Sequence, residues 1–141
     1  MKKVLLDTCV VLDALQERQP FAEPAKKLIL DISADKCQGF LTAKSVTDIY
    51  YLTHKLTHSD EITRQIIRKL FSIFQVVDTT GVDCEQALIS DVHDYEDGIM
   101  VETALRIGAD FIVTRNIKDF ANAKINVCLP QDFLERLEYY D

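Results

Sequence analysis

The sequence is poor in several features that mark particular functions. It has no tryptophan, and its four glycines stand singly, so it lacks the glycine-rich loop that cradles phosphates in nucleotide-binding proteins. Its four cysteines form no Cys-x-x-Cys pair and its three histidines complete no zinc spacing, which predicts reduced, mostly buried thiols. No apolar run approaches the roughly 20 residues that a bilayer crossing needs. The first apolar run stops at Asp7, which is too early for the apolar region of a signal peptide. We therefore expect no membrane association and a cytoplasmic location.

Basic side chains are also in the minority, with 16 Lys and Arg against 23 Asp and Glu and a net charge of −7. This balance argues against a broad nucleic-acid-binding surface, which is normally basic. The argument weakens if several carboxylates gather around divalent cations. The 141 residues are 48% hydrophobic and 28% charged, without linkers or repeats, so we expect one globular domain over residues 1–141.

Short apolar strands alternate with amphipathic helices along the chain. We expect strands at 2–6, 40–41, 75–77, 111–114 and 127–129, and helices at 10–15, 21–35, 42–56, 61–74, 82–90, 94–107 and 131–139. The clearest helix, 61–74, should pair with the preceding one as a hairpin, and its apolar stripe is Ile62, Ile66, Leu70, Phe71 and Phe74. The alternation predicts an α/β fold, a three-layer α-β-α sandwich around a central parallel sheet of four or five strands.

The first candidate site residue is Asp7, which ends the apolar run Val4-Leu5-Leu6. A short unbroken apolar run reads as a strand buried on both faces. In open α/β sheets, ligands bind at the carboxyl ends of such strands, where Asp7 would emerge. The alternative is that Asp7 only caps the next helix.

The second candidate is Asp97, which shares one helical face with Val101 and Ala104. Asp97 thus heads an apolar stripe that should face the sheet, while Asp94 is placed to cap the helix. Burial of an unpaired carboxylate is costly, and a cation would supply the partner. The alternative is a first-turn carboxylate that the helix dipole favours.

Two further aspartates follow other predicted strands. The strand at 111–114 runs into a polar cluster in which Thr114 and Asn116 can donate hydrogen bonds to carboxylates or to phosphate, and Asp119 should lie above the same sheet edge as Asp7. The alternative is a turn rich in polar residues. Asp48 lies early in the helix at 42–56, where the alternative is a solvated acid on a helix face.

Together these segments resemble the PIN-domain family of metal-dependent nucleases, most of all the small single-domain toxins of prokaryotic type II toxin–antitoxin pairs. The resemblance rests on Leu-Leu-Asp-Thr around Asp7, Ser-Val-Thr-Asp-Ile-Tyr around Asp48, Tyr-Glu-Asp-Gly around Asp97, and Thr-Arg-Asn-Ile-Lys-Asp-Phe around Asp119. It places the acidic quartet of the family on these four aspartates. Cys9 stands where the family usually has Asn, and Asp48 where it usually has Glu.

The resemblance implies an endoribonuclease that hydrolyses RNA phosphodiester bonds with Mg²⁺ or Mn²⁺, cations that prefer oxygen ligands. The resemblance also implies two candidate partners. One is an antitoxin protein, whose peptide would lie across the groove beside the helix hairpin, and the other is a second copy of the chain in a homodimer. The side chains expected to support the site or position the substrate are Thr8, Thr114, Arg115, Asn116 and Lys118.

Two other readings stay open at this point. Cys9 and the acidic surface motivate a PIN-like binding module with weakened catalysis. A remoter alternative is a phosphatase that uses Asp7 as its nucleophile. Such enzymes have a second aspartate two residues after the first, where this chain has Cys9.

Overall fold

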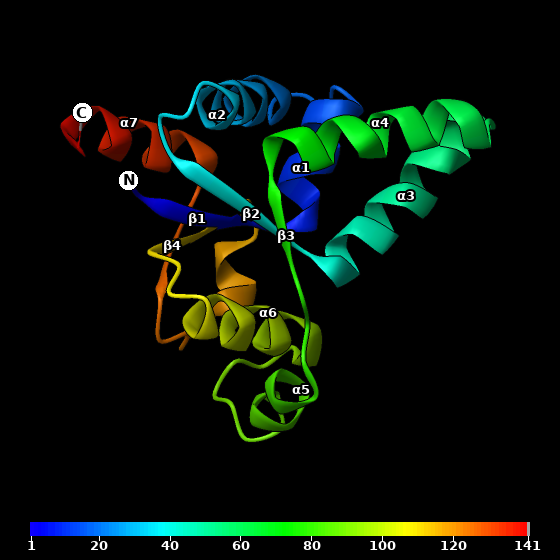
Figure 1. Ribbon diagram of the computed structural model, residues 1–141. Helices are drawn as coiled ribbons and strands as arrows, with labels where there is room; N and C mark the ends of the chain where they lie inside the picture. The colour runs from blue at the N-terminus through cyan, green and yellow to red at the C-terminus, as the bar shows by residue number, and fades with distance from the viewer. Residues whose placement is uncertain (141) are drawn as a thin grey trace.

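The computed structural model describes residues 1–140 (Figure 1). Its centre is one parallel sheet with the strand order β3-β2-β1-β4-β5. The strands are β1 (Lys3–Leu6), β2 (Gln38–Thr42), β3 (Gln75–Val77), β4 (Phe111–Val113) and β5 (Asn126–Cys128). The predicted parallel sheet is confirmed, with five strands. Leu5 of β1 pairs with Phe40 on one side and with Ile112 on the other, so β1 is the central strand.

Helices cover both faces of the sheet, which confirms the predicted three-layer sandwich. One face carries α1 (Thr8–Leu15), α2 (Ala22–Ser33), α3 (Ala43–Thr57), α4 (Asp60–Ile73) and α7 (Pro130–Tyr140). The other carries α5 (Gly81–Ala87), α6 (Tyr95–Arg106) and the 3-10 helix η1 (Ile117–Phe120), as Figure 1 shows for α5 and α6. No helix in the described part of the chain combines the length and apolar character that crossing a bilayer requires.

The position of β1 at the centre of the sheet accounts for its apolar run. Successive side chains of a strand point to opposite faces of the sheet. Val4 and Leu6 belong to the larger core under α1, α2 and α7, whereas Leu5 packs in the smaller core under α6. All three are fully buried, so the run from Val4 to Leu6 must be apolar until the strand reaches the sheet edge at Asp7.

Two of the differences from prediction concern the end of α5 and the buried face of α4. The helix predicted at 82–90 ends earlier, at Ala87. The stripe predicted for 61–74 is correct for Leu70 and Phe74 but wrong for Ile62 and Phe71, which are 49% and 55% exposed. Thr63 is buried instead, because its hydroxyl is satisfied by Thr57 Oγ1 at 2.7 Å and by the Ser59 carbonyl at 2.8 Å.

The direction in which strands are added to the sheet reverses at β1. After β1 the chain adds β2 and β3 on one side and then crosses to build β4 and β5 on the other. In open parallel sheets, the carboxyl ends of the two strands at such a reversal form the usual ligand site. Here those strands are β1 and β4, and the backbone N–H of Asp7 donates to the Val113 carbonyl at 2.9 Å.

Candidate functional site

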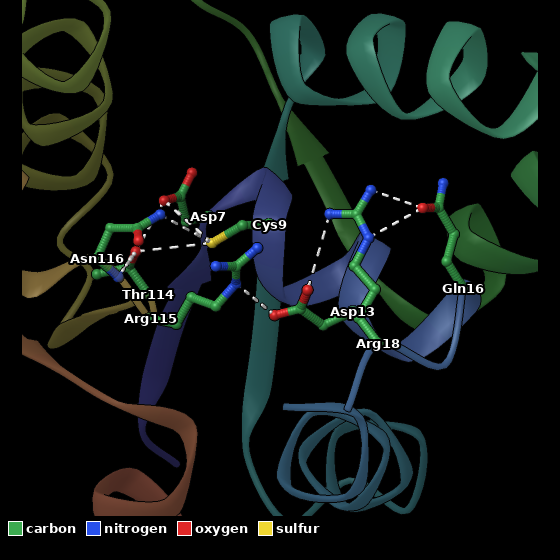
Figure 2. A network of polar contacts seen from close by, with 8 residues as sticks. All are labelled: Asp7, Cys9, Asp13, Gln16, Arg18, Thr114, Arg115 and Asn116. Carbon is green, nitrogen blue, oxygen red and sulfur yellow. Dashed lines mark hydrogen bonds and ion pairs between the residues drawn. The ribbon is translucent and has the colours of Figure 1, made fainter. Parts of the chain in front are cut away.

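Asp7 directly follows β1, at the carboxyl end of the strand. It occupies the position before α1, yet within residues 1–140 its side chain caps no backbone N–H of that helix. Its Oδ2 instead accepts a hydrogen bond of 2.8 Å from the hydroxyl of Thr114, which follows β4 (Figure 2). Helix capping therefore does not account for this carboxylate.

Cys9 joins the same cluster from the first turn of α1. Its Sγ lies 3.5 Å from Asp7 Oδ2, as a donor, and 3.8 Å from Thr114 Oγ1. Asn116 donates from Nδ2 to Cys9 Sγ at 3.9 Å and from its backbone N–H to Thr114 Oγ1 at 3.0 Å (Figure 2). Burial, with the nearby charge of Asp7, raises the pKa of the Cys9 thiol to about 11, so the thiol is a neutral donor to Asp7 at neutral pH.

A cleft of about 160 Å³ opens beside Asp7. Three of the four predicted carboxylates line it: Asp7, Asp48 and Asp97. Asp119 is exposed on η1 and does not line the cleft, although its charge acts on Asp97. The other lining residues are largely polar and come from the end of β2, the segment after β3, and the first turns of α1, α3 and α6: Thr8, Thr42, Lys44, Ser45, Thr79, Glu96, Ile99 and Met100.

Asp97 lies in the first turn of α6, above a buried apolar stripe as predicted. Val101 and Ala104 are 2% and 0% exposed, and Asp94 caps the helix by accepting from the Asp97 N–H at 3.0 Å. Burial raises the pKa of Asp97 to about 7, and the charges of Asp7, Asp94, Asp119 and Glu96 add to this effect. The metal-free cleft thus disfavours a further negative charge and favours the uptake of a proton or a cation.

Lys44 is a site residue that sequence reasoning missed. It lies in the first turn of α3, with Nζ 2.9 Å from Asp48 Oδ2 and 3.6 Å from Glu96 Oε2. The spacing of four residues between Lys44 and Asp48 is a signal for the first contact. The contact with Glu96 joins α3 to α6 and had no local signal, because these residues are 52 positions apart by subtraction of their numbers.

Arg115 is held away from the cleft by a buried partner. Its Nε donates to Asp13 Oδ2 at 2.8 Å (Figure 2). Its guanidinium carbon lies 4.5 Å from the centre of the Phe21 ring. Asp13 is 1% exposed, and its only other cation is Arg18, 3.8 Å away, among the residues described. An aspartate directly after the apolar run of α1 was the available signal for this pair. Lys118 is exposed on η1.

The donor chemistry of the cleft fits a divalent cation. Its wall offers carboxylate oxygens from Asp7, Asp48 and Asp97 and hydroxyls from neighbouring residues, the ligand type that Mg²⁺ and Mn²⁺ prefer. Across residues 1–140, however, no three Asp, Glu, His or Cys side chains lie close enough together to form a closed metal cage. The carboxylates therefore line one cleft but do not converge on a single position for a cation.

The fold and site define an α/β domain with an acidic cleft at the carboxyl edge of its central strands. A family model described as "PIN domain" matches residues 3–118. The chain therefore belongs to the PIN-domain family, which confirms the family predicted from its motifs.

Solved structures share this fold at low sequence identity. One of FitAB bound to an IR36 DNA fragment is 20% identical with a TM-score of 0.70, covering 90% of this chain and 94% of that one. A toxin–antitoxin complex from Klebsiella pneumoniae is 22% identical with a TM-score of 0.67, covering 90% and 97%. VapC20 from Mycobacterium tuberculosis, described as a sarcin-ricin loop cleaving toxin, is 13% identical with a TM-score of 0.64, covering 87% and 98%. Comparison with curated protein sequences gave no match.

Proposed function

We propose that this protein is an endoribonuclease that hydrolyses RNA phosphodiester bonds with Mg²⁺ or Mn²⁺. The observation that carries the proposal is the meeting of Asp7, Asp48 and Asp97 in one cleft of a PIN domain. The similarity to VapC20, described as a sarcin-ricin loop cleaving toxin, supports it by analogy. The toxin–antitoxin complexes among the similar structures support a toxin role, which also implies a cytoplasmic site of action.

The four aspartates share one task in this proposal. Asp7, Asp48, Asp97 and Asp119 would hold the cation through carboxylate oxygens. When bound, the cation would activate water and stabilise negative charge that develops on the phosphodiester. Thr114 and Cys9 hold Oδ2 of Asp7, which leaves its Oδ1 for the cleft.

Other residues would position these carboxylates. Thr8 donates to Ser45 Oγ at 3.0 Å, which ties the start of α1 to the start of α3. Asn116 supports Thr114 and Cys9, as described above. We propose that Arg115 acts through Asp13, by anchoring the segment that carries Thr114, and that the exposed Lys118 contacts RNA.

An antitoxin has a suitable surface on the helix hairpin. A groove of about 520 Å³ runs between α3 and α4, lined by Val46, Thr47, Tyr50, Tyr51, Arg64, Ile67, Arg68 and Phe71. We propose that an antitoxin peptide binds here with an apolar face, because Tyr51 and Phe71 are 64% and 55% exposed. A homodimer remains a second proposed assembly.

A PIN-like binding module without catalysis is the second candidate function. The observation that favours it is the absence of a closed three-ligand cage in residues 1–140, together with Cys9 at a supporting position. Calorimetric titration with Mn²⁺ separates the two functions. A protein that takes up no Mn²⁺ at millimolar concentration would be such a module.

The main test is cleavage of RNA by the purified protein. With Mn²⁺, we expect cleavage of at least one of a set of structured and single-stranded RNAs, and loss of that cleavage in Asp7→Asn. Asp35→Asn is the matched control, because it removes one exposed carboxylate in the turn before β2, and its positive φ of 58° suits asparagine. Equal rates for the parent and Asp7→Asn would refute the proposal.

Cys9→Asn should strengthen metal binding. An amide N–H is a stronger hydrogen-bond donor than a thiol, so Asp7 should be held more firmly. Supporting groups of this kind typically change metal affinity by about 10-fold to 100-fold, and we expect about tenfold tighter Mn²⁺ binding by calorimetry. Cys9→Ala, which removes the donor altogether, should bind Mn²⁺ more weakly than the parent. If all three proteins bound Mn²⁺ equally, Cys9 would have no part in positioning Asp7.

A further inference from the structure

We propose that Lys44 binds a backbone phosphate of RNA in the acidic cleft and is the principal phosphate-binding side chain of this site. The inference rests on the proposed ribonuclease function and adds a substrate contact to it. The juxtaposition that carries it is an ammonium group set between Asp48 and Glu96 on the wall that also holds Asp7 and Asp97.

The charges of the cleft show why such a contact is needed. Asp7, Asp48, Glu96 and Asp97 all line it, and RNA would bring further negative charge to the same place. Among the described residues that line the cleft, Lys44 is the one basic side chain. An ammonium here offsets part of the repulsion between the carboxylates and the phosphates that a cation alone must otherwise overcome.

Lys44 can exchange its carboxylate partners for a phosphate with little loss of stability. Its side chain is 45% exposed, and those of Asp48 and Glu96 are 43% and 70% exposed. Ion pairs with this much exposure contribute little to stability, so the ammonium is not locked into them. A divalent cation on Asp48 would compete for one of these partners and would leave Nζ available to phosphate.

Lys118 does not line the cleft, and Arg115 is less available than Lys44. Arg115 directs its guanidinium to the buried carboxylate of Asp13 and onto the ring of Phe21. Its release toward RNA would leave Asp13, which is 1% exposed, without its hydrogen bond. Burial of an unpaired carboxylate opposes such a movement. Phosphate recognition at the cleft therefore falls to Lys44.

Salt-dependent RNA binding tests this assignment. We would measure the fluorescence anisotropy of a labelled single-stranded RNA with the Asp97→Asn protein, which is expected not to cleave it, over a range of salt concentrations. Each phosphate contact to a single strand contributes about 0.7 to the slope of log affinity against log salt, so adding Lys44→Ala should lower the slope by about 0.7. At low salt the affinity should fall about fivefold, and Lys44→Arg should restore most of it.

Lys26→Ala is the matched control, because Lys26 also lies between two carboxylates, Glu17 and Glu23, but on α2. It changes the net charge equally and should leave the slope as it was. An unchanged slope in Lys44→Ala, with the parent still cleaving RNA, would overturn the Lys44 inference alone. A parent protein that neither binds nor cleaves RNA would overturn the proposed function itself. Equal losses in Lys44→Ala and Lys26→Ala would reduce the effect to net charge and also refute the assignment.

Discussion

Asp97→Asn is expected to abolish RNA cleavage and, in the same protein, to raise the stability of the metal-free fold at neutral pH. The loss of activity should exceed the roughly 100-fold that supporting groups of a metal site cost, because Asp97 is proposed as a direct ligand. The gain in stability follows from the position of Asp97, where burial and four neighbouring carboxylates oppose its charge and raise its pKa to about 7.

The direction of the stability effect depends on pH. From about pH 4 to about pH 7 the folded chain holds a proton on Asp97 that the unfolded chain has released, so the free energy of unfolding falls as pH rises. Asparagine carries no charge and removes this loss. After allowance for solvent screening of a partly exposed carboxylate, we expect a gain of about 2 kcal/mol above about pH 7 and little change at about pH 4.

Urea unfolding in the presence of a chelator, at an acidic and a neutral pH, measures this effect. Glu102→Gln is the matched control, since it removes one carboxylate further along α6 without lining the cleft. It should leave both the activity and the pH dependence near those of the parent. If Asp97→Asn were no more stable than the parent at neutral pH, the carboxylate would not be electrostatically opposed in the metal-free protein.

Arg115→Met is expected to destabilise the fold by about 3 kcal/mol, which is the second large effect. Asp13 is 1% exposed and its Oδ2 accepts from Arg115 at 2.8 Å, while in the described structure its Oδ1 accepts no hydrogen bond. Removal of the arginine therefore leaves a buried carboxylate with Arg18 alone, 3.8 Å away. The loss would appear as a lower urea midpoint with an unchanged slope.

The two partners should not be equivalent. Asp13→Leu should cost less than Arg115→Met, because the Arg115 side chain is 28% exposed and can be hydrated when its partner is gone. The double variant, with two apolar side chains, should recover most of the loss. Lys118→Met, in the same polar segment but exposed, serves as the control. An Arg115→Met protein of normal stability that bound RNA poorly would instead favour a direct phosphate contact for Arg115.

The parts of this molecule that were predictable have local causes. The alternation of apolar strands with helices predicted the parallel sheet. The pattern is visible in the sequence because the central strands are buried on both faces and are therefore apolar. Asp7 and Asp97 stood out because each interrupts an apolar pattern, at a strand end and at the head of a helix stripe. The cleft contains both, with Asp48, although the metal and catalytic roles of these residues remain proposals.

The pairs of side chains from distant segments were not predictable. Lys44 meets Glu96, and Arg115 meets Asp13, only because the fold brings the start of α3 near the start of α6 and the segment after β4 near α1. Such pairs depend on the final packing and on side-chain rotamers, which leave no periodic signal. The exposed position of Phe71 has a similar origin, since a helix stripe does not reveal how much of itself a neighbouring helix will cover.

The strand order also sets when the cleft can exist during synthesis on the ribosome. Asp7 and its hydrogen-bond partner Thr114 are separated by 107 residues, which take roughly 5 to 20 seconds to translate. Until β4 emerges, one edge of β1 has no neighbour, and an unpaired apolar edge invites pairing with other chains. Until the fourth strand docks, a nascent chain of this protein therefore lacks the hydrogen bond that holds Asp7 and is prone to association with other chains.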